Sequence, residues 1–187
     1  PFKNFKNVKV NQAIKHPTWK MGKKISIDSA TLVNKLFEVI EAQRLFDIDI
    51  NKISIKIHPQ SYIHSIIKFK NGIIKICGHE PNMSIPIAIS LDKNLKYTHK
   101  SNINFKILNS LNFNDVNKKK FQVIKILEKY PNHCSLFDTA LVSINDELVS
   151  LFLDKKISFD EISKNLLKIL NLRSIKKLKK IVPKNYS

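Results

Sequence analysis

The chain has 187 residues, 43% of them hydrophobic, which is enough for the cores of one or two small globular domains. No apolar run approaches the ~20 residues that a membrane-spanning helix needs, so no membrane partner is expected. The net charge of +18 comes almost entirely from lysine, because only Arg44 and Arg173 are arginines; base-specific readout relies on arginine, so no nucleic-acid partner is expected.

The cysteines and the first residue bear on compartment and completeness. Cys77 and Cys134 lack the spacing of a metal site, so we expect both to be reduced and buried. With no visible leader peptide, this predicts a cytoplasmic protein. The chain begins at Pro1 and not at methionine, which predicts a fragment or a processed piece.

The first 46 residues predict a polar loop, a strand and a helix. Residues 1–23 are polar and end in a turn between Trp19 and Gly22. The alternation in Lys24–Ile27 predicts a short strand. Asp28 and Ser29 are then expected to cap a helix over residues 30–46. The apolar stripe of this helix, at 3.6-residue spacing, consists of Val33, Leu36, Phe37 and Ile40.

The next segment predicts strands. Residues 53–57 alternate between apolar and polar side chains, and Ile63–Cys77 predicts a hairpin around Asn71-Gly72. A two-residue turn at Asn71-Gly72 fixes the register of the hairpin. The expected partners across it are Phe69 with Ile74, Ile67 with Ile76, and Lys68 with Lys75.

The rest of the chain is mainly helical in pattern. Helical periodicity covers residues 120–130, 137–153, 159–171 and 174–181, and Ser158 with Glu161 forms a capping box. The fold class predicted is α+β: a small mixed or antiparallel sheet with helices, followed by an α-helical C-terminal domain. The expected boundaries are a domain over 1–92 with a flap loop, an Asn- and Lys-rich linker over 93–117, and a helical domain over 118–187.

One face of the helix predicted over residues 30–46 carries polar side chains. Lys35 and Glu38, three residues apart, alone indicate a surface ion pair. Asn34 in a helix interior needs a partner for its side chain. Ser29 at the predicted helix start would lie near free N–H groups that favour an anion, and Glu38 offers a hard oxygen ligand for Mg²⁺ or Mn²⁺. We therefore expect all four side chains to open onto one cleft.

Two further groups of residues surround this helix in sequence. His16, Trp19 and Met21 precede it, and Trp19 on a polar loop suits a lid that excludes water. The alternatives are that Trp19 anchors packing and that Met21 fills a gap. Near the hairpin, His58 and His64 are spaced unlike a metal pair on one helix face, which favours a structural or supporting role.

The sequence resembles the 1-deoxy-D-xylulose 5-phosphate reductoisomerase family, strongly over residues 14–92 and weakly afterwards. The motifs that carry the resemblance are His16-Pro17-x-Trp19-x-Met21-Gly22-x-Lys24-Ile25-Ser26-x-Asp28-Ser29-Ala30-Thr31, Asn34-Lys35, Glu38-x-Ile40-Glu41-Ala42, His58-Pro59-Gln60-Ser61-x-Ile63-His64-Ser65 and Glu80-Pro81-x-Met83-x-x-Pro86-Ile87. A weaker likeness lies at Asn145-Asp146-Glu147. As a set these motifs are specific to that family.

The resemblance implies an activity and a site. The family rearranges 1-deoxy-D-xylulose 5-phosphate and reduces it with NADPH to 2-C-methyl-D-erythritol 4-phosphate, using Mg²⁺, Mn²⁺ or Co²⁺. It implies a bacterial cytoplasmic enzyme of isoprenoid biosynthesis, homodimeric at full length. Glu38 then resembles the metal ligand, and Ser29, Asn34 and Lys35 resemble the contacts to the hydroxyls and phosphate of the substrate.

The loop and hairpin residues also receive roles from the resemblance. His16 resembles the histidine beside the substrate phosphate, and Trp19 the indole over the substrate. Met21 resembles the residue near the nicotinamide, and Ser61 and His64 resemble supporting residues. With Glu38 and Lys35, His16 is thereby expected to be catalytic.

Two departures from the family pattern remain. Leu36-Phe37 replaces the usual Gly-Leu, and both residues extend the apolar stripe, so we expect repacking. The family's Gly-rich NADPH-binding domain and its Asp-Ser-Glu metal segment do not occur in this sequence. The chain is therefore expected to correspond to the C-terminal portion of the enzyme and to be inactive alone.

Two other classes of function compete with this interpretation. A basic RNA-associated binding module would use the lysines Lys176, Lys177, Lys179 and Lys180. A zinc hydrolase would use His16, His58 and Glu38, whose scatter along the chain makes it the weaker alternative.

Overall fold

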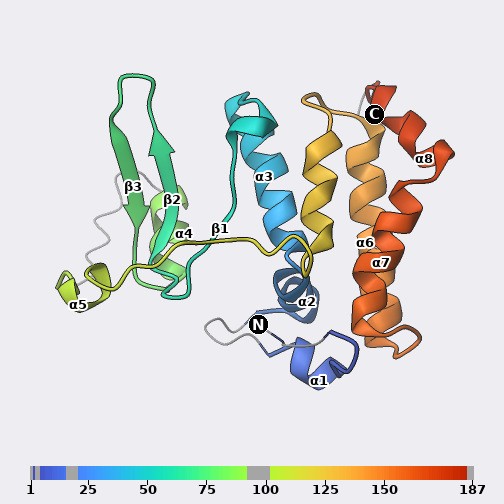
Figure 1. The fold of residues 1–187 in the computed structure, drawn as a ribbon, viewed down its shortest axis with the longest axis horizontal. Helices are drawn as coiled ribbons and strands as arrows, with labels where there is room; N and C mark the ends of the chain where they lie inside the picture. The colour runs from blue at the N-terminus through green and yellow to red at the C-terminus, as the bar shows by residue number, and fades with distance from the viewer. Residues whose placement is uncertain (1, 3–4, 16–20, 92–101, 185–187) are drawn as a thin grey trace. The chain divides into compact units, whose positions relative to one another are not determined.

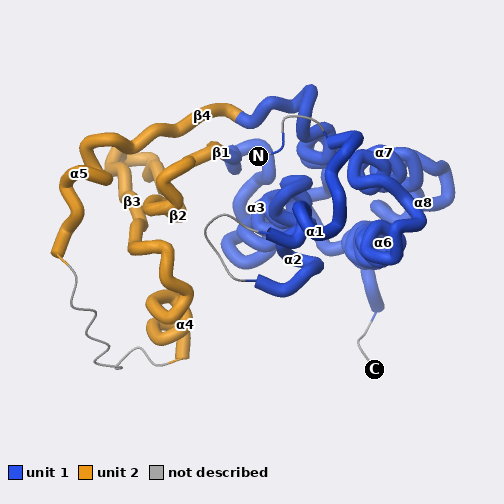
Figure 2. Tube along the Cα trace, turned by 90° about the horizontal axis from the view of Figure 1, so that it is seen from below, with its two compact units in different colours: residues 1–55, 116–187 blue, residues 56–115 orange. Residues whose placement is uncertain are grey.

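The structure is a computed structural model that describes residues 2, 5–15, 21–91 and 102–184. The chain divides into two compact units, residues 1–55 with 116–187 and residues 56–115 (Figure 2). In the described part of the chain no helix is long and apolar enough to cross a membrane.

The first unit is helical (Figure 1). Its elements are α1 (Val10–Ala13), α2 (Lys23–Thr31), α3 (Val33–Phe46), the 3₁₀ helices η1 (Ile50–Lys52), η2 (Gln122–Lys129) and η3 (Leu178–Lys180), α6 (Leu136–Leu153), α7 (Phe159–Leu170) and α8 (Arg173–Lys177). The N-terminal pair α2 and α3 packs with the C-terminal helices, because α3 contacts η2, η2 contacts α7, and α2 contacts α6. Segments far apart in sequence therefore share one core.

The core of this unit follows the helical periodicity of the sequence. The buried side chains of α6 lie on one face of the helix: Phe137, Leu141, Asn145, Leu148, Val149 and Phe152. Phe159, at the start of α7, packs edge-on against Phe2, Phe5 and Phe152. The backbone N–H of Ser158 donates to the Glu161 carboxylate at 2.7 Å, which confirms the predicted capping box.

The second unit is small and open. Strand β1 (Lys56–Ile57) pairs antiparallel with β4 (Asn114–Asp115), and β2 (Ile63–Lys68) pairs antiparallel with β3 (Ile74–Gly78). It also contains the helices α4 (Ser84–Leu91) and α5 (Phe105–Leu108). None of its described residues is buried, and most isoleucines of the hairpin are exposed, from 46% at Ile67 to 60% at Ile73. Antiparallel two-stranded sheets beside helices confirm the α+β class.

The hairpin is where the sequence placed it, but its predicted register is wrong by one residue. The turn is a three-residue loop, in which the Gly72 N–H donates to the Phe69 carbonyl and the Phe69 N–H donates to the Ile73 carbonyl. Gly72 has the positive φ of 89° that this loop requires. The extra loop residue shifts every pair, which exchanges the faces of one strand. The observed partners are Lys68 with Ile74, Ile67 with Lys75, and Ile66 with Ile76.

The strand predicted over Lys24–Ile27 is also wrong, because these residues belong to helix α2. Ile27 is fully buried, whereas Ile25 is 42% exposed, so the two do not share a face. The hydroxyl of Ser26 donates to the Gly22 carbonyl, four residues back, as on a helix. A helix buries both Ile27 and Thr31, four residues apart, and this burial outweighs the local alternation that suggested a strand.

Other local predictions need correction. Residues 1–23 include the short helix α1, and the segment predicted as a linker over 93–117 includes α5 and β4. Both cysteines, Cys77 and Cys134, are free but exposed, not buried. The contacts within the chain place residues 1–55 in one unit with the C-terminal helices, and this division differs from the predicted boundaries at 92 and 117. The domains predicted over 1–92 and 118–187 of a longer protein stay a prediction.

Candidate functional site

A sharp break between α2 and α3 creates the candidate site. Leu32, between the two helices, adopts the left-handed conformation with φ 64°, which costs about 1 kcal/mol for a residue other than glycine. The Thr31 hydroxyl donates to the Ile27 carbonyl at 3.0 Å and accepts from the Val33 N–H at 3.5 Å. The break therefore ends α2 and starts α3 within two residues, and the polar face of α3 begins there.

Three side chains meet on this face of α3. The amide nitrogen of Asn34 donates to Oε1 of Glu38 at 2.6 Å, and the ammonium of Lys35 donates to Oε2 of Glu38 at 2.6 Å. The ion pair is half exposed, with 47% of the Lys35 side chain and 44% of the Glu38 side chain accessible. The opposite face is buried through Val33, Leu36, Val39 and Gln43. The partner expected for Asn34 is thus found.

This arrangement combines an amide, a cation and a carboxylate on an accessible surface. A carboxylate has about four lone-pair positions, so Glu38 retains acceptor capacity beyond its bonds to Asn34 and Lys35. The ammonium of Lys35 carries the charge that attracts an anionic group, and the Asn34 amide suits a hydroxyl. The cluster has the chemistry to bind a polar anion and to offer one hard oxygen ligand to a divalent cation.

Ser29 does not cap the helix that carries these residues, which corrects the sequence prediction. It lies half-buried in the last turn of α2, where its carbonyl accepts from the Leu32 N–H at 3.3 Å. The N-cap residue of α3 is Leu32 and not Asp28 or Ser29. The free N–H groups at the start of α3 therefore do not lie at Ser29, and any contact of Ser29 with a ligand must come from its own hydroxyl.

The remaining predicted residues fall in three places. His16 and Trp19 lie outside the described residues. Met21 is half-buried in the segment before α2. Ser61 and His64 belong to the second unit, where Ser61 has a φ of 51° and the His64 ring stacks on His79 at 3.8 Å between centroids. Their support of the site stays a prediction.

His58 also lies in the second unit. Its Nδ1 is 3.0 Å from the Asn112 carbonyl, and its ring stacks on Phe113. These contacts agree with the structural role that its spacing favoured. Within the described part of the chain, no group of three or more His, Cys, Asp or Glu side chains is placed to hold a metal ion. Glu38 could thus supply one ligand of such a site but not a complete set.

The sequence interpretation missed a buried polar cluster beside the site. Asp28, 3% exposed, accepts from Lys24 Nζ at 2.7 Å and from Asn145 Nδ2 at 2.9 Å. Burial opposes the charge of Lys24, but its hydrogen bonds to Asp28 and Asp146 raise its pKa above the ordinary value. One signal was present in the sequence: Asn145 stands in the apolar stripe of α6, where a polar residue implies a buried partner.

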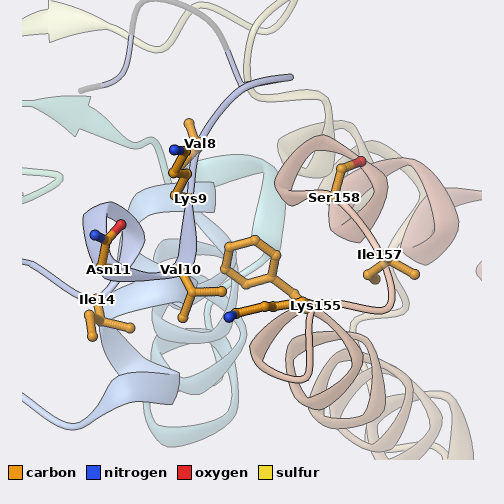
Figure 3. Close-up of a pocket in the computed structure, with 9 residues that line it drawn as sticks. Val8, Lys9, Val10, Asn11, Ile14, Lys155, Ile157 and Ser158 are labelled. Atoms are coloured by element: carbon orange, nitrogen blue, oxygen red, sulfur yellow. The ribbon is translucent and has the colours of Figure 1, made fainter.

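A cavity of ≈600 Å³ lies elsewhere in the first unit (Figure 3). It is lined mainly by α1 and by the connection between α6 and α7, and Lys155 extends toward Val10 across it. Its lining includes no residue of the candidate site. The residues are Val8, Lys9, Val10, Asn11, Ile14, Phe152, Lys155, Ile157 and Ser158. The candidate site is therefore an accessible surface of α3 and not this cavity.

Two family models match the chain. A 1-deoxy-D-xylulose 5-phosphate reductoisomerase C-terminal domain matches residues 1–46, and a DXP reductoisomerase C-terminal domain matches residues 79–185. The first match covers the α2–α3 break and the cluster of Asn34, Lys35 and Glu38. The second covers more than half of the chain.

Named relatives agree with these models. The 1-deoxy-D-xylulose 5-phosphate reductoisomerase of Pelagibacter ubique is 48% identical over 99% of this chain and 49% of its own length. That of Clostridium tetani is 42% identical over 84% of the chain and 41% of its own length. The chain spans about half the length of the curated relatives it matches.

Solved structures show the same likeness. A DOX-P reductoisomerase in complex with NADPH, fosmidomycin and magnesium has a TM-score of 0.81 and 32% identity, covering 92% of this chain and 43% of that one. The enzyme from Zymomonas mobilis in complex with NADPH has a TM-score of 0.74 and 30% identity, covering 93% of this chain and 46% of that one.

Proposed function

The chain belongs to the 1-deoxy-D-xylulose 5-phosphate reductoisomerase family, and from this membership we propose that it forms the C-terminal part of such an enzyme. The full-length protein would convert 1-deoxy-D-xylulose 5-phosphate into 2-C-methyl-D-erythritol 4-phosphate. It would do so as a cytoplasmic homodimer in isoprenoid biosynthesis, using NADPH with Mg²⁺, Mn²⁺ or Co²⁺. Related structures in complex with NADPH and magnesium support this choice of cofactors.

The cluster on α3 is the observation that carries this proposal. Asn34, Lys35 and Glu38 are joined by two hydrogen bonds of 2.6 Å on an accessible helix face, at the positions that match the family's motif. The ammonium of Lys35 would hold the substrate phosphate or an ionised hydroxyl, and the Asn34 amide a neutral hydroxyl. Ser29 would add its hydroxyl from the end of α2.

Glu38 is proposed as a ligand of the divalent cation. A bound cation of this kind stabilises the negative charge that develops on oxygen during rearrangement of the carbon skeleton. The described residues contain no group of three or more His, Cys, Asp or Glu side chains placed to hold a metal ion, so we propose that further ligands come from outside them. The bonds from Asn34 and Lys35 hold the Glu38 side chain in one orientation, which reduces the entropy lost when it coordinates an ion.

The other roles rest on the family motif alone. We propose that His16 binds the phosphate, that Trp19 covers the substrate and excludes water, and that Met21 contacts the nicotinamide. Ser61 and His64 are proposed as supporting residues. NADPH supplies the hydride, and the residues of this chain orient the acceptor.

An assay of the full-length protein tests the proposal. NADPH consumption should require both 1-deoxy-D-xylulose 5-phosphate and a divalent cation, and it should stop when a chelator is added. Product analysis should find 2-C-methyl-D-erythritol 4-phosphate. A folded, metal-loaded full-length protein that consumed no NADPH with this substrate would overturn the proposed function.

The RNA-associated alternative has little structural support. Its basic stretch forms α8 and η3, and Lys179 there is not free for a ligand. Its ammonium donates to the Lys129 carbonyl at 2.5 Å and lies 4.7 Å from the centre of the Phe137 ring. Burial, and then the nearby Lys176 and Lys129, lower its pKa, as expected for a cation used in packing.

A further inference from the structure

A buried hydrogen bond ties the helix before the site to the long helix α6. Nδ2 of Asn145 donates to Oδ1 of Asp28 at 2.9 Å, and the two residues are 0% and 3% exposed. Both belong to the first unit. Oδ1 of Asn145 is buried without a hydrogen-bond partner. A buried amide whose oxygen has no hydrogen-bond partner contributes little to stability. The presence of Asn145 at this buried position therefore needs a reason other than stability.

Lys24 strengthens the same link. Its ammonium lies 2.7 Å from Oδ2 of Asp28 and 3.0 Å from Oδ1 of Asp146, which follows Asn145 in α6. The Asp28 carboxylate thus receives one bond from its own helix and one from α6. The carboxylate is held in a single orientation by groups that do not belong to the proposed site.

Asp28 is in turn next to the residues of that site. It directly precedes Ser29, and its carbonyl lies 3.2 Å from the Thr31 hydroxyl, whose single proton it shares with the Ile27 carbonyl. The same hydroxyl accepts from the Val33 N–H, at the first residue of α3. Displacing Asp28 would therefore move Ser29 together with the start of the helix that carries Asn34, Lys35 and Glu38.

We propose that Asn145 is a positioning residue for the reaction. Acting through Asp28, it fixes the end of α2 so that the Ser29 hydroxyl and the polar face of α3 meet one substrate. This inference rests on the proposed function, because it assigns Ser29 and α3 to the same bound molecule. It gives the C-terminal helix α6 a part in catalysis without contact with the substrate.

Steady-state kinetics of the full-length protein test this role. Asn145→Leu keeps the approximate volume but removes the donor. We expect kcat/KM for the phosphorylated sugar to fall about 100-fold, the loss that a misplacement of about 1 Å produces. The matched control is Tyr130→Phe, which removes a hydrogen bond of 2.6 Å from Tyr130 to the Asp138 carboxylate in the first turn of α6. Tyr130→Phe should lower the melting temperature about as much as Asn145→Leu does, but it should leave kcat/KM unchanged.

A rescue experiment separates positioning from stability. The double variant Asp28→Asn with Asn145→Asp exchanges the amide and the carboxylate, so one donor still faces one acceptor. It should recover kcat/KM to within a few-fold of wild type. Normal kcat/KM in folded Asn145→Leu would overturn the inference. If Asn145→Leu does not fold, the double variant decides, and a folded double variant that remains about 100-fold impaired overturns it.

Hydrogen exchange provides a measurement that does not depend on turnover. In folded Asn145→Leu, amide exchange should accelerate selectively in residues 26–36, around the α2–α3 break. Unchanged exchange there, or an equal increase throughout the chain, overturns the positioning role. If the wild-type protein turns over no substrate, the proposed function fails, whereas this measurement still judges the link between Asn145 and the break.

Discussion

The hydroxyl of Tyr130, at the end of η2, donates to Oδ1 of Asp138, in the first turn of α6, at 2.6 Å. The same carboxylate accepts from Arg44 at 3.1 Å and from the Ser135 N–H at 3.3 Å. Arg44 lies in the last turn of α3, so this carboxylate joins the far end of the site helix to the start of α6. Burial of Tyr130, and then its bond to Asp138, raise the pKa of the phenol well above its usual value.

Alkaline unfolding should therefore depend on Tyr130. Below about pH 10 the phenol is neutral in both states, so its contribution is constant. Above that pH the unfolded chain releases the proton while the folded protein retains it, so stability falls as pH rises. Tyr130→Phe should lose less stability than wild type between about pH 9 and about pH 11. Urea midpoints measured across this range check the prediction, and parallel curves for the two proteins would contradict it.

Glu38→Gln in the full-length protein tests the metal ligand. The amide keeps the shape but lacks the charge that a hard divalent cation requires, so kcat should fall by orders of magnitude. Stability should change by less than about 0.5 kcal/mol, because the ion pair with Lys35 is half exposed. Glu128→Gln is the control, since Glu128 is similarly exposed and pairs with Lys118. Near-normal turnover of Glu38→Gln at saturating Mg²⁺ or Mn²⁺ would end the assignment.

Lys35→Ala should act mainly on substrate binding. Loss of one cation beside an anionic substrate is expected to raise KM about 10-fold, equivalent to about 1.4 kcal/mol. The effect should be larger at low salt, because the screening length grows from about 8 Å at 0.15 M to about 30 Å at 0.01 M. Measuring KM at both ionic strengths, with Lys118→Ala as control, checks this. An effect on KM that does not change with salt would contradict a role for the Lys35 charge, and an equal change in the control would argue for a general effect of surface charge.

The chain alone should neither bind NADPH nor turn over substrate. It has three glycines and no Gly-rich dinucleotide motif, and its described residues hold no complete metal site. Titration of NADPH fluorescence with the 187-residue chain should give no saturable signal, and mixing with a matching N-terminal half should restore activity. Measurable NADPH oxidation by the chain by itself would refute this.

Features set by local sequence were predicted well. The helices predicted over 137–153 and 159–171 differ from α6 and α7 by one residue at one end, because a buried stripe repeats through both. The meeting of Asn34, Lys35 and Glu38 followed from helical spacing alone. In each case residues three or four positions apart determine the outcome.

Features set by distant contacts were missed. The strand predicted at Lys24–Ile27 failed because packing of Ile27 in the shared core outweighed a short alternation. The role of Asp28 was misassigned because its partner Asn145 is 117 positions away. The hairpin was found, but Asn71-Gly72 does not by itself state whether the loop has two residues or three, and this sets the register.

The open hairpin of the second unit has a practical consequence for handling the protein in isolation. Its isoleucines lie on a sheet of two strands, and in the described part of the chain no third strand pairs with either edge, which is the arrangement that seeds aggregation. Lys68 and Lys75 interrupt the apolar run and act as gatekeepers. Colloidal solubility of the chain would then depend on mutual repulsion by its charge of +18, so concentrated salt should precipitate it.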